Sequence, residues 1–262
     1  MNPRRVPTAL SIAGSDSGGG AGIQADLKAF ARCGVHGMTA ITAITAQNTL
    51  GVEAVEAISP QTIVAQVGAV AEDIGVDAVK VGMLGTAETV AAVVEALGLV
   101  GDAPVVVDPV MVAESGAVLL DEEARAALVE RLLPLAAVVT PNIPEARALA
   151  GAEEHESQDD LAREVLALGP GAVVVTGGHS ERLVDLFYDG RDSVEIAGER
   201  HPDGAAHGSG CTHSSALAAF LAHGQAPLEA ARKARTIASE AVAHGLREVG
   251  QGPGPVDVFG LR

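Results

Sequence analysis

Short runs of apolar residues without polar alternation recur along the chain. Each run is rich in Val and Ala, which is typical of strands buried on both faces of a parallel sheet. The runs cover residues 9–13, 78–81, 104–107, 136–139 and 172–175. We therefore predict a central, mostly parallel sheet.

Between these runs lie stretches with apolar residues at three- and four-residue intervals, a spacing that predicts amphipathic helices. Several of them have Ser, Thr or Asp near the start, where such residues cap a helix. The predicted helices cover residues 23–33, 60–73, 86–97, 121–132, 159–168 and 229–246. The alternation of strands and helices predicts right-handed βαβ crossovers and a three-layer α/β/α fold.

A different pattern follows the last apolar run. Residues 183–188 and 193–197 are strand-like and are joined by Asp189-Gly190-Arg191, which predicts a β-hairpin. The sheet is therefore expected to be mixed, with an antiparallel edge hairpin. No internal repeat or long linker interrupts the chain, so we expect a single domain over residues 1–262.

Composition and charge narrow the class of protein. The chain has 262 residues, 48% of them hydrophobic, which is enough for the core of one large domain. Its net charge of −17 argues against a nucleic-acid partner. No apolar window approaches the roughly 18 residues of a membrane span. The two cysteines, Cys33 and Cys211, lack metal-ligand spacing, so we expect a cytoplasmic enzyme without membrane partners.

A glycine-rich segment, residues 14–22, follows the first predicted strand and opens a helix. Within it, Gly20, Gly22 and Ala25 fit the G-x-G-x-x-A spacing of dinucleotide-binding turns. The next strand ends in Thr45-Ala46-Gln47 without the acidic residue that would bind a ribose, which argues against a nicotinamide cofactor. Two interpretations stay open: a flexible turn, or the one we favour, a close backbone approach to a ligand.

A second glycine-rich turn, His207-Gly208-Ser209-Gly210-Cys211-Thr212, precedes the apolar residues 214–222. No Walker-type sequence is present, so this turn is the better candidate for phosphate. It places free N–H groups at a helix N-terminus, where an anion is stabilised. The helix dipole is expected to favour the thiolate of Cys211. Spacing alone also allows Cys211 to be an inert buried thiol.

Two carboxylates suited to magnesium follow predicted strands. Asp108 comes after residues 104–107, and Glu145 lies in Thr140-Pro141-Asn142-Ile143-Pro144-Glu145. Magnesium prefers a few such oxygen ligands shared with phosphates and water. Helix capping by Asn142 and ordinary solvation of Glu145 are equally good explanations of the same residues.

Together, the motifs closely resemble those of the hydroxymethylpyrimidine/phosphomethylpyrimidine kinases of thiamine biosynthesis, in the same order and over nearly the whole chain. The resemblance implies a ribokinase-like fold, ATP and Mg2+ as cofactors, a homodimer, and two successive phosphorylations, first of a pyrimidine alcohol and then of its monophosphate. It rests on residues 13–28, 45–49, 79–84, 108–112, 141–146 and 207–212, and on Gly177-Gly178 with His179.

The resemblance also implies roles for individual residues. Cys211 would be the base, or would position the attacking hydroxyl, and Gly208, Ser209 and Gly210 would stabilise charge on the transferred phosphoryl group. The pyrimidine pocket would be lined by Gly14, Asp26, Gln47, Met83 and Val110; the nucleotide would contact Asn142, Thr176, Gly178 and His207; the metal would be held by Asp108 and Glu145.

Two departures from the family pattern stand out. Thr176 replaces a lysine that many relatives carry near the ATP phosphates, and residues 202–206 lack the Thr and Asn that precede the His-Gly in many of them. Two alternative functions remain. Gln47 argues against a pyridoxal or pyridoxine kinase, and the retained Asp108, Glu145 and Gly208–Cys211 turn argue against a non-catalytic pyrimidine-binding protein.

Overall fold

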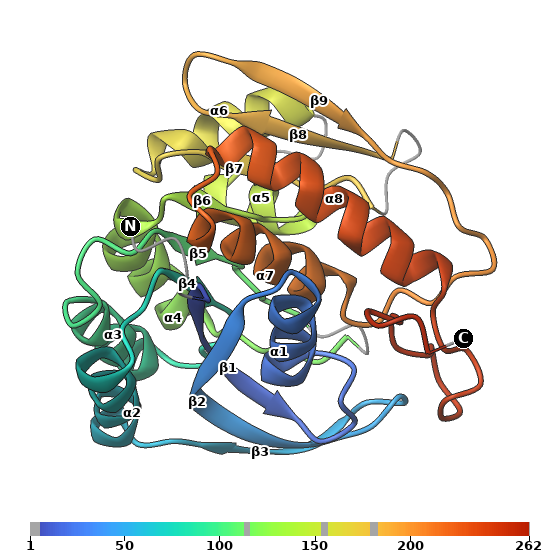
Figure 1. Ribbon diagram of the computed structural model, residues 1–262. Coiled ribbons are helices and arrows are strands. Elements are labelled where there is room, and N and C mark those ends of the chain that lie inside the picture. The colour runs from blue at the N-terminus through green and yellow to red at the C-terminus, as the bar shows by residue number, and fades with distance from the viewer. Residues whose placement is uncertain (1–5, 113–115, 153–156, 179–182, 262) are drawn as a thin grey trace.

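One sheet runs through the middle of the molecule in the computed structural model, which describes residues 6–112, 116–152, 157–178 and 183–261 (Figure 1). Its strands, among these residues, lie in the order β3-β2-β1-β4-β5-β6-β7-β8-β9. The strands are β1 (Thr8–Asp16), β2 (His36–Gln47), β3 (Val52–Ala57), β4 (Ala78–Val81), β5 (Val105–Val107), β6 (Val138–Val139), β7 (Val173–Val175), β8 (Val184–Tyr188) and β9 (Ser193–Ala197).

The predicted mixed sheet is confirmed. Strands β2, β1, β4, β5, β6 and β7 are parallel to one another, and β7, β8 and β9 pair antiparallel as the predicted edge hairpin. Strand β3 was not predicted, and it forms a second antiparallel edge against β2. Its sequence, Val-Glu-Ala-Val-Glu-Ala, is almost wholly exposed, so pairing with β2 rather than burial holds it in place.

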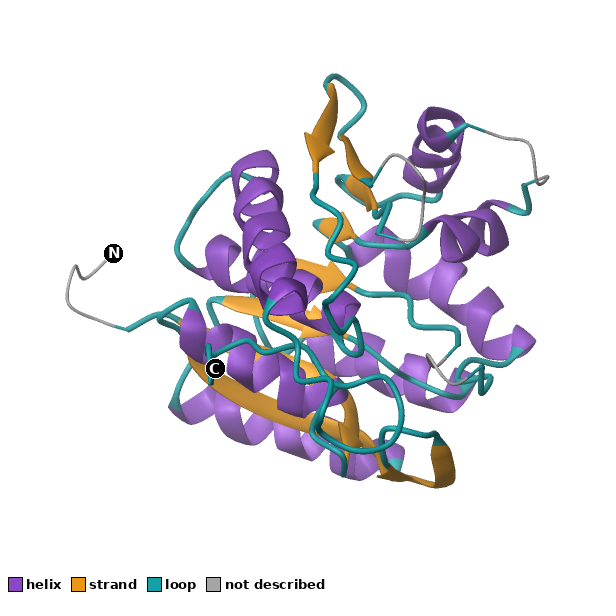
Figure 2. Ribbon diagram, turned by 90° about the vertical axis from the view of Figure 1, so that its right-hand side faces the viewer, coloured by secondary structure: helices purple, strands orange, loops and turns teal. Residues whose placement is uncertain are grey.

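Helices cover both faces of the sheet, which Figure 2 shows edge-on between two purple layers. The predicted helices are present with small shifts at their ends, and the segment predicted at 121–132 changes from α4 to a π turn, η1, and then to a 3-10 turn, η2. With α5, α7 and η2, which lie outside the ranges predicted from periodicity, the helices and helical turns of the described residues are α1 (Gly22–Arg32), α2 (Pro60–Asp73), α3 (Ala87–Leu97), α4 (Glu122–Ala127), η1 (Leu128–Leu132), η2 (Leu133–Leu135), α5 (Ile143–Ala150), α6 (Gln158–Ala167), α7 (Ser209–Ala222) and α8 (Pro227–Ala243).

The alternation of side chains along each strand divides the core in two. Helices α2 to α6 pack on one face, against residues such as Leu10, Val79 and Val107. Helices α1, α7 and α8 pack on the other face, against Ala9 and Val106. None of the helices in the described ranges combines the length and apolar character that a bilayer crossing requires.

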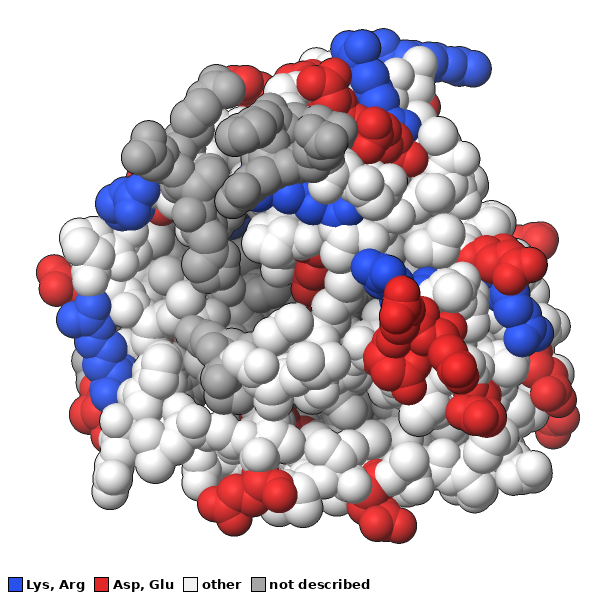
Figure 3. Space-filling view, turned by 180° about the vertical axis from the view of Figure 1, so that it is seen from behind, with Lys and Arg blue, Asp and Glu red and all other residues white. Residues whose placement is uncertain are grey.

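The outer surface is acidic. Figure 3 shows Asp and Glu side chains scattered over one face, with blue side chains between them and no broad basic patch among the coloured residues. An anionic ligand must therefore be held by local groups rather than by the long-range field.

Candidate active site

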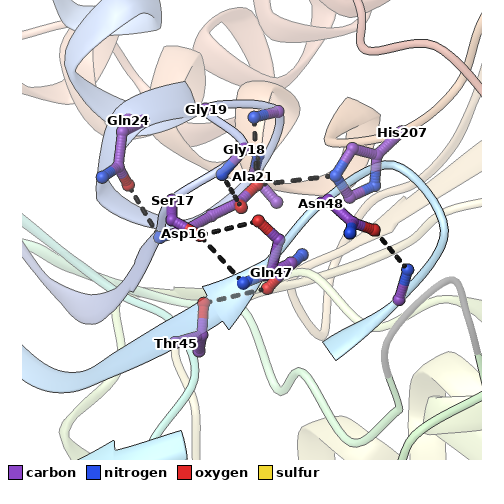
Figure 4. A network of polar contacts seen from close by, with 12 residues as sticks. Asp16, Ser17, Gly18, Gly19, Ala21, Gln24, Thr45, Gln47, Asn48 and His207 are labelled. Carbon is purple, nitrogen blue, oxygen red and sulfur yellow. Dashed lines mark hydrogen bonds and ion pairs between the residues drawn. The ribbon is translucent and has the colours of Figure 1, made fainter. Parts of the chain in front are cut away.

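Asp16, at the end of β1, organises the first glycine-rich loop. Its carboxylate accepts hydrogen bonds from the N–H groups of Gly18 (2.7 Å), Gly20 (3.0 Å) and Ala21 (2.8 Å), as Figure 4 shows in part. His207 Nε2 lies 3.5 Å from the same carboxylate. Burial opposes the charged form, but the contact with His207 and the hydrogen bonds from Ala21 and Gly18 lower the pKa of Asp16. The protein itself therefore satisfies these three N–H groups of the loop.

The glycines of this loop make room for other parts of the chain. A Cβ at Gly20 would lie 2.3 Å from Cδ2 of His207, and a Cβ at Gly22 would lie 2.4 Å from the carbonyl oxygen of Gly14. The contact between Gly20 and His207 packs the first glycine-rich loop against the second. The close approach of this loop to a ligand stays a prediction.

The second turn begins α7 as predicted. Gly208 is its N-cap, with φ +84°, and a Cβ there would lie 1.8 Å from the carbonyl oxygen of Gly20. Only glycine fits both the left-handed backbone and the close contact. The N–H groups of Gly210 and Cys211, in the first turn, have no partner within the helix, as at the start of any α-helix. Gly210 is exposed, so this turn can receive an anion.

Cys211 departs from the expectation that the helix dipole favours its thiolate. Burial raises the pKa of the Cys211 thiol to about 12, and the carboxylates of Asp108 and Asp26 act in the same direction. Lys80, and a hydrogen bond from the N–H of Gly22, favour the thiolate but do not outweigh these effects. Low dielectric surroundings and two neighbouring anions therefore dominate the dipole.

Lys80 is a residue that the sequence-based site lacked. Its side chain is fully buried in β4, and its Nζ lies 2.9 Å from Oδ1 and 3.1 Å from Oδ2 of Asp26. Burial lowers and Asp26 raises the pKa of Lys80, and the net shift is upward. The sequence offers one signal for this residue, a single lysine within an apolar strand. A lysine buried there needs a partner for its charge.

Asp26, which is predicted to line the pyrimidine pocket, is wholly buried. Besides Lys80, its carboxylate accepts hydrogen bonds from the hydroxyls of Ser11 (2.5 Å) and Ser215 (2.7 Å). These contacts fix the orientation of the carboxylate, and its place in the pyrimidine pocket stays a prediction.

The two candidate metal ligands lie at neighbouring strand ends. Asp108 follows β5 and accepts a hydrogen bond of 2.9 Å from the hydroxyl of Ser214. Burial raises the pKa of Asp108 against the effects of Lys80 and Ser214. Burial and the nearby Asp108 raise the pKa of Glu145 to about 8. The two carboxyl groups repel each other, and a divalent cation between them would remove that repulsion.

Asn142 and Glu145 also form a helix cap, as the alternative explanation of these residues predicts for Asn142. Asn142 Oδ1 accepts from the N–H of Glu145 at 2.8 Å, and Glu145 Oε2 accepts from the N–H of Asn142 at 2.9 Å. This capping box leaves one Glu145 oxygen outside the box. In the part of the chain that the structure describes, no three His, Cys, Asp or Glu side chains converge as a metal cage. A cation here would depend on phosphate and water for its other ligands, as magnesium does.

The remaining residues of the predicted pyrimidine pocket lie at the carboxyl ends of β1, β2, β4 and β5. A Cβ at Gly14 would lie 3.1 Å from Met83 Cε, so these two residues are in contact. Gln47 is partly exposed, and its Oε1 accepts a hydrogen bond of 3.2 Å from the hydroxyl of Thr45 (Figure 4). Val110 is partly exposed just after Asp108.

Three of the predicted nucleotide residues, Asn142, Thr176 and Gly178, follow β6 and β7, whereas His207 lies in the turn before α7. Thr176 donates its N–H to the carbonyl of Pro141 at 2.8 Å and pairs with Asn142. Gly178 is exposed and has open space where a Cβ would point. The buried carboxylate of Asp185 accepts from the N–H of Gly177 at 3.0 Å and fixes the start of this loop. His179, which belongs to the same motif, lies outside the described residues.

The raised pKa of Glu145 predicts a pH-dependent stability. Between the unfolded value near 4.3 and the folded value of about 8, the folded chain keeps a proton that the unfolded chain releases. Stability from this group is therefore full below that window and is lost as pH rises through it, by up to about 1.4 kcal/mol per pH unit. Glu145→Gln should flatten this slope in urea unfolding measured from pH 5 to 9.

Glu145→Gln keeps the capping hydrogen bond, because an amide oxygen can replace the carboxylate oxygen as its acceptor. Glu123→Gln is a matched control, since Glu123 is an exposed residue of α4. Equal slopes for the wild type and Glu145→Gln would show that Glu145 ionises normally in the folded chain.

The sequence and the fold of this chain are similar to those of known kinases. The family model for phosphomethylpyrimidine kinase matches residues 16–257. The hydroxymethylpyrimidine/phosphomethylpyrimidine kinase of Rhizobium meliloti is 50% identical, over 96% of each chain. A pyridoxal kinase structure from Bacillus subtilis, an ADP complex, is 39% identical with a TM-score of 0.89, covering 98% of this chain and 99% of the other.

A phosphomethylpyrimidine kinase structure from Clostridium difficile is 43% identical with a TM-score of 0.80, covering 90% of this chain and 99% of the other. The fold is thus that of the ribokinase-like kinases, with the two glycine-rich segments, the carboxylate pair and Cys211 gathered at the carboxyl ends of the strands. The chain belongs to the phosphomethylpyrimidine kinase family.

Proposed function

We propose that this kinase transfers the γ-phosphoryl group of ATP to 4-amino-5-hydroxymethyl-2-methylpyrimidine and then to the resulting monophosphate, in thiamine biosynthesis. The observation that carries the proposal is the packing of the Gly208 turn against Gly20, which sets Cys211 at the start of α7 near Asp108. Relatives named for this activity, 42–50% identical over nearly the full length, support it.

In this mechanism the N–H groups of the Gly208–Cys211 turn receive the oxygens of the transferred phosphoryl group. They are fixed before the substrate binds, so they stabilise developing charge without reorganisation. Cys211 takes the proton of the attacking hydroxyl or holds that hydroxyl in line. Thr176 supplies no positive charge where many relatives have lysine, so this turn carries more of the neutralisation.

The metal Mg2+ fits the carboxylates of Asp108 and Glu145, which repel each other in its absence. When bound, it would neutralise charge on the phosphate oxygens of ATP. The raised pKa of both carboxyl groups means that metal binding would release protons, so affinity for the metal should rise with pH. Asn142, Thr176, Gly178 and His207 would contact the nucleotide.

Gly14, Asp26, Gln47, Met83 and Val110 would form the pyrimidine pocket. The Gln47 amide can accept from an exocyclic amino group while it donates to the adjacent ring nitrogen, provided its oxygen exchanges Thr45 for the substrate. We place the enzyme in the cytoplasm. A homodimer would suit the outer strands β2 and β3, where Ile44 of β2 and Val55 of β3 are half exposed.

Pyridoxal phosphorylation is the second candidate function. The likeness to the B. subtilis pyridoxal kinase, with its TM-score of 0.89, favours it, because the two substrates are both small aromatic alcohols. Gln47 is the feature that we expect to distinguish the substrates, through its paired donor and acceptor.

A coupled ATP-consumption assay tests these alternatives with four acceptors: the hydroxymethylpyrimidine, its monophosphate, pyridoxal, and none. We expect turnover with both pyrimidines. Gln47→Ala should raise KM for the pyrimidine at least tenfold while KM for ATP changes little, because it removes hydrogen bonds to the pyrimidine alone. Turnover of pyridoxal only, or equal effects of Gln47→Ala on both KM values, would contradict the assignment.

A further inference from the structure

A buried polar cluster adjoins the two described ends of the connection between β7 and β8, Gly177-Gly178 and Leu183. Asp185, on β8, is wholly buried, and its Oδ1 accepts a hydrogen bond of 3.0 Å from the N–H of Gly177. Nη1 of Arg235, on α8, lies 3.5 Å from the same oxygen (Figure 1 shows α8 beside β8). A buried ion pair often adds little to stability compared with apolar side chains of similar volume. Stability alone therefore does not explain this pair.

Leu183, the second of these loop ends, has an unusual backbone. Its φ is +49°, and among the residues that the structure describes it is the only non-glycine residue with a positive φ. This conformation is unfavourable for a residue with a Cβ, so surrounding contacts must hold it. Nη2 of Arg235 donates a hydrogen bond of 3.0 Å to the carbonyl of Leu183. Arg235 therefore acts on both loop ends, through Asp185 at the first and directly at the second.

His213, on α7, faces the same carboxylate but differs from Arg235. Its Nε2 lies 3.6 Å from Oδ2 of Asp185, which is too far for a hydrogen bond. Burial lowers the pKa of His213, and Arg235 adds to this against the effect of Asp185. The imidazole is therefore neutral near neutral pH, and Arg235 is the cation that balances the charge of Asp185.

Gly198 makes room for the guanidinium group of Arg235. It follows β9, and a Cβ at this position would overlap Nη2, Cζ and Nε of Arg235. Nη2 is the nitrogen that donates to Leu183. The backbone of Gly198 is not left-handed, so the contact with Arg235 is what excludes a larger residue here. An alanine at this position would displace the guanidinium group from the loop end.

We propose that Arg235 is a positioning residue for the nucleotide: paired with Asp185 and bonded to Leu183, it fixes the two loop ends so that Gly178 keeps its place against ATP. The inference rests on the proposed function, in which Gly178 contacts the nucleotide. A residue that acts in this way should affect nucleotide binding and leave binding of the pyrimidine nearly unchanged.

The pairing of β7 with β8 does not depend on Arg235. The two strands form an antiparallel ladder. The side-chain amide of Gln158 joins them as well, since it donates to the carbonyls of Val175 (2.8 Å) and Val184 (2.9 Å). Loss of the Arg235 contacts should therefore shift the loop ends and leave the strands in place.

The test uses Gly198→Ala, which displaces the guanidinium group and keeps every charge. Binding of AMP-PCP with Mg2+ is measured by isothermal titration calorimetry without an acceptor. We expect Kd to rise about fivefold or more, because the loop ends lose a hydrogen bond from a charged group. In steady-state kinetics KM for ATP should rise by a similar factor, while KM for the pyrimidine stays within about twofold. A general loss of structure would not separate the two KM values.

Arg235→Ala completes a double-mutant cycle. Alone, it should raise Kd at least as much as Gly198→Ala does. In the Arg235→Ala background, Gly198→Ala should add nothing, because the new methyl group no longer meets a guanidinium group. Arg232→Ala is the matched control and should leave Kd unchanged, since Arg232 lies on the same helix in an exposed pair with Glu229. Gly198→Ala keeps Asp185 paired in charge, so the test stands even where Arg235→Ala does not fold.

An unchanged Kd in the folded Gly198→Ala variant would overturn the inference. Additive effects of Gly198→Ala and Arg235→Ala would overturn it as well, because Gly198→Ala would then act on something other than Arg235. So would an equal rise of both KM values. Because binding of AMP-PCP requires no acceptor, the calorimetric outcome is independent of whether the enzyme phosphorylates the pyrimidine. A wild type that bound no AMP-PCP would overturn the nucleotide role of Gly178 and the inference together.

Discussion

Cys211→Ala is expected to lower kcat by about a hundredfold and to leave KM for ATP and for the pyrimidine within about twofold. The estimate is the lower end of the usual range for a general base, because phosphoryl transfer demands little of the base and depends mainly on positioning. The thiol, with a pKa of about 12, is mostly protonated near neutral pH. Steady-state kinetics with both substrates varied would check the prediction.

The pH dependence of kcat is a second test of the Cys211 thiol. In the wild type, kcat should keep rising through the alkaline range, because the thiolate fraction grows until pH passes the pKa of Cys211. The rise should be absent in Cys211→Ala. Cys33→Ala is the matched control and should retain both turnover and pH profile, since Cys33 follows the last residue of α1. Full turnover by Cys211→Ala would exclude a role for the thiol as base.

Much of the fold followed from the hydrophobic pattern, because strands buried on both faces leave uninterrupted apolar runs. Strand β3 escaped prediction, since its residues are exposed and its stability comes from pairing with β2. Helix α7 gave only an apolar stretch instead of a helical periodicity. It is buried on nearly every side, between the sheet and α8, so no polar face marks its period.

Only those features of the site that depend on local sequence could be predicted. Gly208 and Cys211 could be placed at a helix start from local sequence. The pKa of Cys211 could not be predicted, because it depends on Lys80, Asp108 and Asp26, which come from other elements of the fold. Lys80 and Asp26 lie 54 positions apart in sequence, and nothing in either local segment indicates the ion pair.

Gly208→Ala is expected to have the largest effect on the fold and on activity together. Its backbone is left-handed, with φ +84°, which costs an alanine about 1–2 kcal/mol. The new Cβ would also lie 1.8 Å from the carbonyl oxygen of Gly20, so the two glycine-rich segments must separate. We expect a loss of about 3 kcal/mol or more in urea unfolding, since both penalties apply.

Activity should fall further than stability alone explains. Separation of the two segments moves the first turn of α7, and a displacement of about 1 Å in a phosphoryl-transfer site can cost a hundredfold in rate. We therefore expect kcat/KM to fall by about two orders of magnitude, measured at a temperature where the variant is still folded.

Gly101→Ala measures the cost of a left-handed backbone without the steric contact that Gly208→Ala adds. Gly101 is also left-handed, with φ +64°, but a Cβ there would have nothing within 4 Å, and the residue lies in the turn between α3 and β5. This variant should lose only about 1–2 kcal/mol and keep its activity, because it bears the conformational cost alone. Equal losses for Gly101→Ala and Gly208→Ala would show that contact with Gly20 contributes nothing. In that case the site would not depend on the packing of the second glycine-rich turn against the first.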